Sequence, residues 1–183
     1  MEAGRAGLVA LFRGYARAAA AARDRELAEE FARFALEQPD CLHRSCRPGH
    51  FTGSAWVVDA ARRRTLLTHH RKLDKWLQLG GHADGEANLA EVALREAREE
   101  SGLANIRLVS PEIYDLDRHL IPARGAEPAH WHYDVRFLIE ADPAEPLVIT
   151  SESKDLAWVD LTDVARLNAE ESLLRLVRRT PKI

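Results

Sequence analysis

The sequence predicts a mixed α/β domain that is preceded by an N-terminal helical extension. Residues 5–38 are rich in Ala, Arg and Glu and contain no Pro, a composition that favours helix. After residue 50, short segments follow one another in a pattern that is typical of strands. These segments surround one strongly periodic segment at 88–101, and strands around a central helix indicate a mixed α/β fold. We expect the extension and its linker to occupy residues 1–48 and the α/β domain to occupy residues 49–183.

The composition excludes several classes of protein. The 183 residues carry a formal net charge of −3, whereas a protein that binds nucleic acid through its overall charge is basic. No apolar run approaches about 18 residues, so we expect no membrane-spanning helix. The N-terminal segment has arginines inside its apolar stretch, unlike a signal peptide, and we therefore expect a cytoplasmic protein.

The extension is predicted to form two helices, with a break near residues 22–25 and an end at Pro39. Each helix carries apolar residues three to four positions apart, which must be buried. They are Leu8, Leu11 and Phe12 in the first helix and Leu27, Phe31, Phe34 and Ala35 in the second. Because two short helices cannot form a core alone, we expect them to pack on their own chain or, as the second choice, in a homodimer. Residues 39–50 are a linker by composition.

The domain that follows is predicted to contain strands at 52–59, 65–70, 75–79, 106–117, 131–140 and 155–159, and terminal helices at 162–167 and 169–178. The first two strands form a hairpin around residues 60–64, and Gly80 and Gly81 break the chain after the third. Along the strand at 131–140, apolar residues alternate with His132, Asp134 and Arg136. The apolar side is predicted to face the core, and the polar side to face either solvent or a substrate pocket.

The segment at 88–101 is predicted to be a helix, with Asn88 as its N-cap and Gly102 as its C-terminal stop. At about 100° per residue, Glu96, Glu99 and Glu100 continue the apolar face of this helix. Ionised groups on a buried face are unfavourable unless they are paired or bind a metal, and clustered carboxylates suit Mg²⁺ or Mn²⁺.

Glycines just before this helix, at positions 80, 81 and 85, allow the backbone to approach a ligand or a metal closely. The alternative for the acidic helix is a surface helix with salt bridges. The glycine-rich turn and the continuity of the acids with the apolar face favour a metal site over that alternative.

The stretch REAREESGL, residues 95–103, resembles the core of the Nudix signature, Arg-Glu-apolar-x-Glu-Glu-x-Gly-apolar. Upstream, Gly81 and Glu86 resemble the Gly and Glu of the same signature, with a spacing that is one residue shorter. The resemblance implies an α/β/α sandwich with a mixed sheet. It also implies the hydrolysis of a small-molecule substrate, a nucleoside diphosphate linked to another moiety.

The resemblance also implies roles for single residues. The expected catalytic residues are Arg95, Glu96 and Glu99, and the expected ligands of Mg²⁺ or Mn²⁺ are Gly81, through its carbonyl, Glu96, Glu99 and Glu100. Arg95 is expected to orient the glutamates, with Glu86 in support. The general base is left open between Glu99 and an acid on a later loop, Glu152 or Asp155.

Basic residues near these motifs are candidates for contacts to the substrate. They are Arg71 and Lys72, which precede the glycine turn, and His130, His132 and Arg136 of the later strand. Exposure to solvent is the alternative for each of them. The signature does not identify which diphosphate is bound, because the specificity of such folds lies outside it.

Two further functions remain as alternatives at this point. Isopentenyl-diphosphate isomerases share the fold and use a Cys-Gly-His turn, but Gly80 stands here at the position of their catalytic cysteine. A non-catalytic nucleotide-binding module would be expected to lack the Glu99–Glu100 pair. The segment with Cys41, His43, Cys46 and His50 could form a zinc site, but its spacing is unusual, and free thiols are expected instead.

Overall fold

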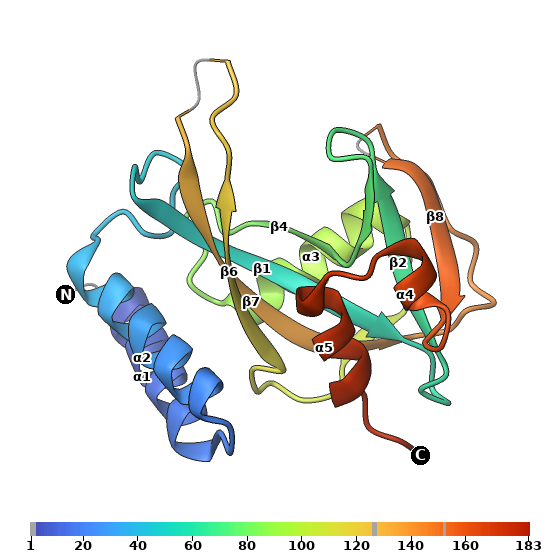
Figure 1. Ribbon diagram of the computed structural model, residues 1–183, viewed down its shortest axis with the longest axis horizontal. Helices are drawn as coiled ribbons and strands as arrows, with labels where there is room; N and C mark the ends of the chain where they lie inside the picture. Colours follow the sequence, from blue (N-terminus) through green and yellow to red (C-terminus); the bar gives the residue numbers. More distant parts are fainter. Residues whose placement is uncertain (1–2, 126–127, 152) are drawn as a thin grey trace.

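Helices and strands follow one another largely as the sequence predicts, and the strands join into one curled mixed sheet (Figure 1). The computed structural model describes residues 3–125, 128–151 and 153–183. Within these ranges the elements are, in chain order, α1 (Ala3–Ala18), α2 (Ala22–Glu37), β1 (Gly49–Val58), β2 (Arg64–His70), β3 (Lys75–Leu77), β4 (Leu79–His82), α3 (Leu89–Ser101), β5 (Ile106–Leu108), β6 (Asp115–Ile121), β7 (His130–Ala141), β8 (Ser153–Asp160), α4 (Val164–Leu167) and α5 (Glu171–Arg179).

The sheet is built around β1 and β7, which pair in parallel from Gly49↔Trp131 to Val58↔Glu140. Its strand order is β3-β2-β1-β7-β5. In addition, β4 pairs with β1, β6 pairs with β7 and β8 pairs with β2. β1 pairs with β2 only at Val58↔Thr65, whereas residues 52–55 of β1 pair with β4. The sheet therefore divides at β1 into two leaves, and the space between the leaves is available for a site.

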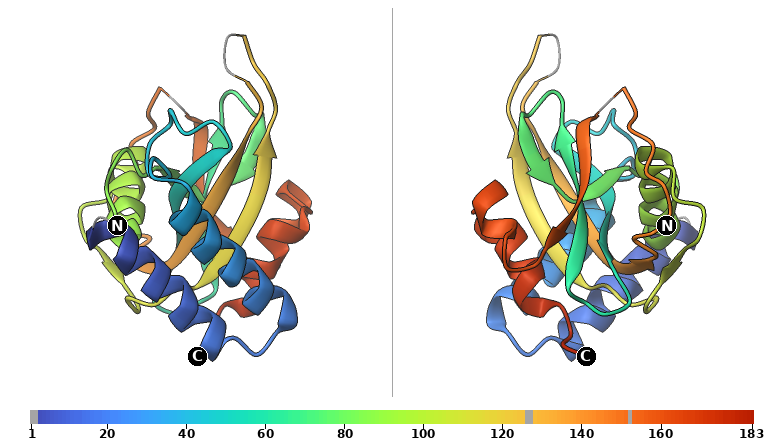
Figure 2. Two further views of the ribbon diagram at one scale, coloured as in Figure 1. Left: turned by 90° about the vertical axis from the view of Figure 1, so that its left-hand side faces the viewer. Right: turned by 90° about the vertical axis from the view of Figure 1, so that its right-hand side faces the viewer.

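Helices cover both faces of this sheet, as the predicted sandwich requires (Figure 2). On one face, α3 and the α1–α2 hairpin pack on a core that contains Phe51, Tyr133 and Phe137. On the other face, Leu173 and Leu176 of α5 join a second core with Trp56 and Leu138. Most residues of β1 and β7 are buried, so most of their polar side chains need partners inside the protein.

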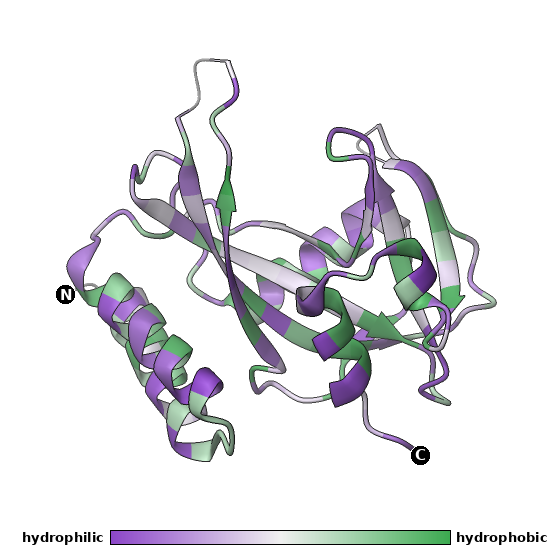
Figure 3. Cartoon of the chain, viewed as in Figure 1, coloured by the Kyte–Doolittle hydropathy of each residue, from purple (hydrophilic) through white to green (hydrophobic). Residues whose placement is uncertain are grey.

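The N-terminal hairpin is part of the main core and not an appendage to it. Hydrophobic and hydrophilic residues alternate along α1 and α2 (Figure 3), and the hydrophobic ones are buried in the same cluster as those of the sheet. Phe12 of α1 stacks on Phe51 of β1 with ring centroids 5.3 Å apart, and Phe34 of α2 stacks on Tyr133 of β7 at 3.9 Å. The expected packing of these helices on their own chain is confirmed, and it buries their apolar faces without a second subunit.

Three details of the predicted elements are wrong. Gly80 and Gly81 do not break the chain but lie within β4, paired with Ser54 and Gly53 of β1, because absent side chains permit this close pairing. The strand expected at 106–117 is two strands, β5 and β6, separated by residues 109–114. The break between the first two helices lies at residues 19–21, slightly before its expected place.

The polar side of β7 follows the prediction in part: His132 and Asp134 line the cavity described below, whereas Arg136 faces neither solvent nor that cavity. Arg136 is 2% exposed, and its guanidinium contacts three carboxylates, at 2.7 Å from Asp134, 3.2 Å from Asp115 and 3.4 Å from Asp117. Arg175 of α5 donates to Asp115 and Asp117 as well, at 2.8 Å each. These groups form a buried ion cluster that joins β6 and β7 to the C-terminal helix.

None of the helices in the described ranges is long and apolar enough to cross a membrane, as the sequence predicts.

The aromatic contacts of α2 predict a large effect of Phe31→Ala. Phe31 is fully buried and lies 5.4 Å from Phe12, 5.9 Å from Phe51 and 5.1 Å from Tyr133 between ring centroids. Its truncation should lower the free energy of unfolding by about 3–5 kcal/mol, measured by denaturant titration. The control Glu29→Ala, on the exposed side of the same helix, should change it by no more than about 0.5 kcal/mol. A loss below about 1 kcal/mol for Phe31→Ala would contradict a shared core.

The ion cluster predicts a second large effect, for Arg136→Met. Removing the guanidinium leaves the carboxylates of Asp115, Asp117 and Asp134 with less compensation inside the protein, which should cost about 3–5 kcal/mol of unfolding free energy. Arg107→Met is the matched control, since its 70% exposed side chain pairs with Glu140 at the surface. Equal stabilities of the two variants in denaturant titrations would show that Arg136 carries no structural role.

Candidate active site

The acidic helix α3 is fixed at both ends by local contacts that the sequence contains. The side chain of Asn88 accepts a hydrogen bond from the Glu91 N–H at 3.4 Å, and Gly102 caps the other end with φ 75°. Between them, Leu89, Val92 and Ala93 are buried against the sheet. The helix that carries the predicted metal ligands is therefore confirmed at its predicted bounds.

Two glycines bring this helix unusually close to the sheet. A Cβ at Gly53 of β1 would lie 2.7 Å from the Leu89 carbonyl oxygen and 2.9 Å from the Val92 side chain. A Cβ at Gly81 of β4 would lie 2.2 Å from Oε2 of Glu96. Any side chain at position 81 would therefore displace the Glu96 carboxylate, so Gly81 is needed for the position of Glu96.

The last turn of α3 is tied to β4 by Glu100. The Gly80 N–H donates to Oε2 of Glu100 at 3.0 Å, and this carboxylate side chain is almost completely buried. Gly80 has a φ of 154° and lies against Ser54, where a Cβ would be only 2.4 Å from the Ser54 hydroxyl oxygen. The backbone of β4 thus binds the Glu100 carboxylate directly, and this hydrogen bond joins α3 to β4.

Arg95 also joins α3 to β4. Its Nη2 donates to Oε1 of Glu96 at 2.7 Å and to the His82 carbonyl at 3.0 Å, and its Nε lies 4.0 Å from Oε1 of Glu99. Burial raises the pKa of Glu96, while the hydrogen bond and the charge of Arg95 act against this. A carboxylate in such surroundings gains stability in its charged form when a further cation approaches.

These groups line a cavity of about 670 Å³. Glu96, Glu99 and Glu100 contribute acids to it, and Glu99 is the most exposed of the three, with 64% of its side chain accessible. The other polar and charged side chains that line it are Arg44, Thr52, Ser54, Thr68, His70, Lys72, Gln78, His82, Asp84, Arg95, His119, His132, Asp134 and Thr150. Carboxylate oxygens are the donors that Mg²⁺ and Mn²⁺ prefer, so this donor set fits a hard divalent cation. The space beside it is large enough for a small organic molecule.

The structure places some of the predicted substrate contacts in this cavity and others elsewhere. Lys72 and His132 line it, whereas Arg71, His130 and Arg136 are absent from its lining. The Arg71 guanidinium donates to the carbonyls of Ser151 and Ser153, at 2.9 and 2.8 Å. His130 and Arg136 are buried in other surroundings.

Two further expectations concern acids. Glu86 is exposed and accepts a hydrogen bond from the Asn88 N–H at 2.7 Å, so it supports the start of α3, and it makes no direct contact with Arg95. Of the loop acids considered as the general base, Asp155 is exposed, accepts from the Leu156 N–H and does not line the cavity. Glu152 lies outside the described residues.

Two features of the cavity were missed in the sequence. Arg44, in the predicted linker, forms a bidentate ion pair with Asp84 beside the glycine turn, with both hydrogen bonds at 2.8 Å. Asp134 accepts hydrogen bonds from Thr52 and Ser54 of β1, at 2.9 and 2.7 Å. The polar residues that alternate in both strands are a sequence signal for the hydrogen bonds to Asp134. The Arg44–Asp84 ion pair has no such signal in the sequence.

The two cysteines do not take part in a metal site. Cys41 and Cys46 are buried free thiols, and burial raises the pKa of Cys41 to about 11. A protonated thiol is a poor metal ligand, and His50 of the same segment points to a different group of side chains. The two cysteines form no disulfide, and neither joins a group of three possible metal ligands in the described part of the chain.

Comparisons with known proteins agree with this geometry. A family model described as the NUDIX domain matches residues 49–180. A search of curated proteins by sequence gave no significant match.

Solved structures resemble the fold at low sequence identity. An Ap4A hydrolase of C. elegans in a binary complex is 16% identical, with 70% of this chain and 93% of that chain covered and a TM-score of 0.57. A NUDIX-family hydrolase from Clostridium perfringens is 26% identical, with 72% and 95% covered and a TM-score of 0.53. A UDP-X diphosphatase is 14% identical with a TM-score of 0.53, and that match covers 96% of this chain and 91% of the other. This last match extends over the N-terminal helices as well.

The contact between Gly81 and Glu96 predicts that Gly81→Ala weakens binding of a divalent ion. The added methyl group must push the Glu96 carboxylate aside, which should lower the affinity for Mn²⁺ by about 10-fold or more, measured by electron paramagnetic resonance of free Mn²⁺. Gly7→Ala is the control, since a Cβ there meets nothing within 4 Å. Identical Mn²⁺ affinities for both variants would contradict this position of Glu96.

Proposed function

Since the chain belongs to the Nudix family of pyrophosphohydrolases, we propose that it hydrolyses the diphosphate bond of a nucleoside diphosphate linked to another moiety, with Mg²⁺ or Mn²⁺ as cofactor. The observation that carries this proposal is the shared position of Glu96, Glu99 and Glu100 on the wall of one cavity. The same cavity contains Lys72, whose charge suits a phosphate.

We assign the metal to the carboxylates of Glu96, Glu99 and Glu100 and to the carbonyl of Gly81. When bound, the ion would neutralise charge on the diphosphate and lower the pKa of a coordinated water. The Gly80 N–H orients Glu100, and the Arg95 guanidinium orients Glu96, so that two of the acids are held before the ion arrives. Arg95 is in this proposal a positioning residue, because its hydrogen bonds go to the protein.

We propose Glu99 as the general base. It is the most exposed of the three acids, and its ion pair with Arg95 is long at 4.0 Å. A side chain with this freedom can reach a water molecule in the cavity and accept its proton through the carboxylate oxygen that does not bind the ion. Glu96 and Glu100 are more strongly buried and are already engaged with Arg95 and Gly80, which suits them to the role of ligands.

The isomerase alternative finds no support in the cavity. Gly80 occupies the position of the required cysteine, and its backbone N–H is bonded to Glu100. Cys41 and Cys46 do not line the cavity, so no thiol is available in it for proton transfer. A non-catalytic nucleotide-binding module would bind the same substrates without hydrolysing them, so a measurement of turnover separates it from the proposed hydrolase.

Glu100→Gln is the sharpest test of the proposed reaction. The amide can still accept from the Gly80 N–H, but it lacks the charge that a metal ligand needs. Turnover should fall by about 1,000-fold, equivalent to about 4 kcal/mol of transition-state stabilisation. The measurement is the formation of the two phosphorylated products, followed by chromatography, from a panel of nucleoside diphosphate derivatives that includes nucleotide sugars and dinucleoside polyphosphates.

The matched control is Glu91→Gln, an exposed acid in the first turn of the same helix, which should retain wild-type turnover. EDTA should abolish the wild-type activity. Undiminished hydrolysis in EDTA would overturn the proposal, and binding of the panel without any turnover would favour the non-catalytic module.

A further inference from the structure

Histidines from four strands gather at one end of the sheet, outside the group of glutamates. The sequence has eight histidines, and those that meet here are His50 of β1, His82 of β4, His119 of β6, and His130 and His132 of β7. Strand register brings them together, since His50 and His119 both lie opposite His132. Neighbouring rings in this histidine cluster have centroids 4.9–5.4 Å apart.

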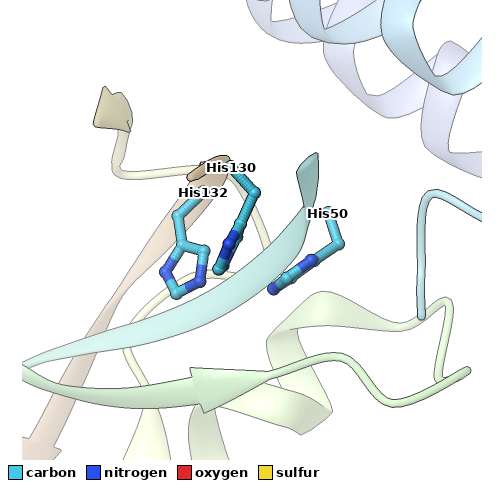
Figure 4. Close-up of side chains that lie close together, drawn as sticks. All are labelled: His50, His130 and His132. Carbon is cyan, nitrogen blue, oxygen red and sulfur yellow. The ribbon is translucent and has the colours of Figure 1, made fainter. Parts of the chain in front are cut away.

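Three members of the cluster, His50, His130 and His132, have the arrangement of metal ligands. One ring nitrogen of each lies within 4.8 Å of the others, and no other group of three His, Cys, Asp or Glu residues in the described part of the chain meets this criterion. Their imidazoles approach one another from two adjacent strands (Figure 4). Tetrahedral coordination at about 2.0–2.1 Å requires nitrogens about 3.4 Å apart, which modest rotations of the rings would supply.

The hydrogen-bonding state of His130 and His132 also favours metal binding. Nδ1 of His130 lies 2.9 Å from the Pro128 carbonyl oxygen, which can only accept, so Nδ1 carries the proton and the lone pair lies on Nε2. Histidines that bind metals commonly have such a carbonyl partner for their other nitrogen. Nε2 of His132 is buried without a hydrogen-bond partner among the described residues, so its lone pair or proton is unsatisfied in the absence of a ligand.

Burial disfavours the charged form of two rings in the cluster. Burial, followed by the proximity of other basic groups, lowers the pKa of His82 to about 4 and that of His132 to about 2. A neutral imidazole is the form that coordinates a metal, and no proton competes for its lone pair.

We propose that His50, His130 and His132 bind a transition-metal ion of the Zn²⁺ class, at a site separate from the glutamates of α3. Three imidazole nitrogens suit Zn²⁺, Co²⁺ or Ni²⁺, whereas the oxygen donors of α3 suit Mg²⁺ or Mn²⁺, so the two sites differ in the ion they select. His132 and His82 also line the cavity, which leaves a fourth coordination position accessible from it. The ion joins β1 to β7 where the two strands begin.

The test uses the full chain, freed of metal, and measures Zn²⁺ binding by calorimetry. The double variant Glu99→Gln/Glu100→Gln removes the carboxylate site as a competitor and should still bind one Zn²⁺ per chain. In that background, His50→Asn and His130→Gln should each weaken binding by more than about 100-fold, since losing a direct ligand costs at least as much as losing an outer partner. His69→Gln is the matched control, because His69 lies outside the cluster and is bonded to Asp74.

A second measurement keeps the proposal testable if a buried histidine variant fails to fold. Co²⁺ added to the double variant should give the intense visible absorption of a four-coordinate nitrogen site, in contrast to the weak bands of oxygen coordination. Zn²⁺ affinity that survives both His50→Asn and His130→Gln would overturn the proposal, as would a weak Co²⁺ spectrum. Neither Zn²⁺ affinity nor the Co²⁺ spectrum depends on hydrolysis. A negative result for the histidine site can therefore be distinguished from a negative result for the proposed reaction.

Discussion

The parallel pairing of β1 with β7 is the constraint on which the rest of the structure depends. Most residues of both strands are buried, so few of their polar groups can rely on bulk water as a partner. On one face this constraint is met by apolar side chains and by Gly53, whose missing side chain admits α3. On the other face polar residues continue along both strands, and each must be satisfied by protein groups or by a ligand.

The residue types on that polar face of β1 and β7 change along the strands, and three sections with different roles result. At the start of the strands it carries the histidines. In the middle, Thr52 and Ser54 donate to Asp134, which also accepts from Arg136 and so connects the cavity wall to the buried ion cluster. At the far end Trp56 and Leu138 form an apolar core with α5. The cavity therefore lies beside a hydrogen-bonded network of Thr52, Ser54, Asp134 and Arg136, which suits a site that must hold its groups in position.

The parts that the sequence predicts well are those encoded over short distances. Helix α3 is contained in one stretch, with its caps, its apolar stripe and its three glutamates all within residues 88–102, so periodicity and capping suffice to place it. The glycine pair of β4 was misjudged because a long-range pairing with β1 outweighs the local tendency of glycine to break strands. The histidine cluster, the partners of Arg136 and the Arg44–Asp84 pair depend on strand register and chain crossing, which local patterns do not contain.

The buried ion cluster also joins the two ends of the polypeptide. Arg179, in the last turn of α5, lies 3.0 Å from Asp115 and pairs with Asp24 of α2, while its Nη1 donates to the Tyr15 hydroxyl of α1. During synthesis on the ribosome, Asp24 and Asp115 emerge long before Arg175 and Arg179 of α5, which complete their ion pairs. The amino-terminal hairpin can collapse early onto β1, but the Arg179 guanidinium that pairs with its Asp24 is made only after all strands of the sheet, so this ion cluster is completed only once α5 has been synthesised.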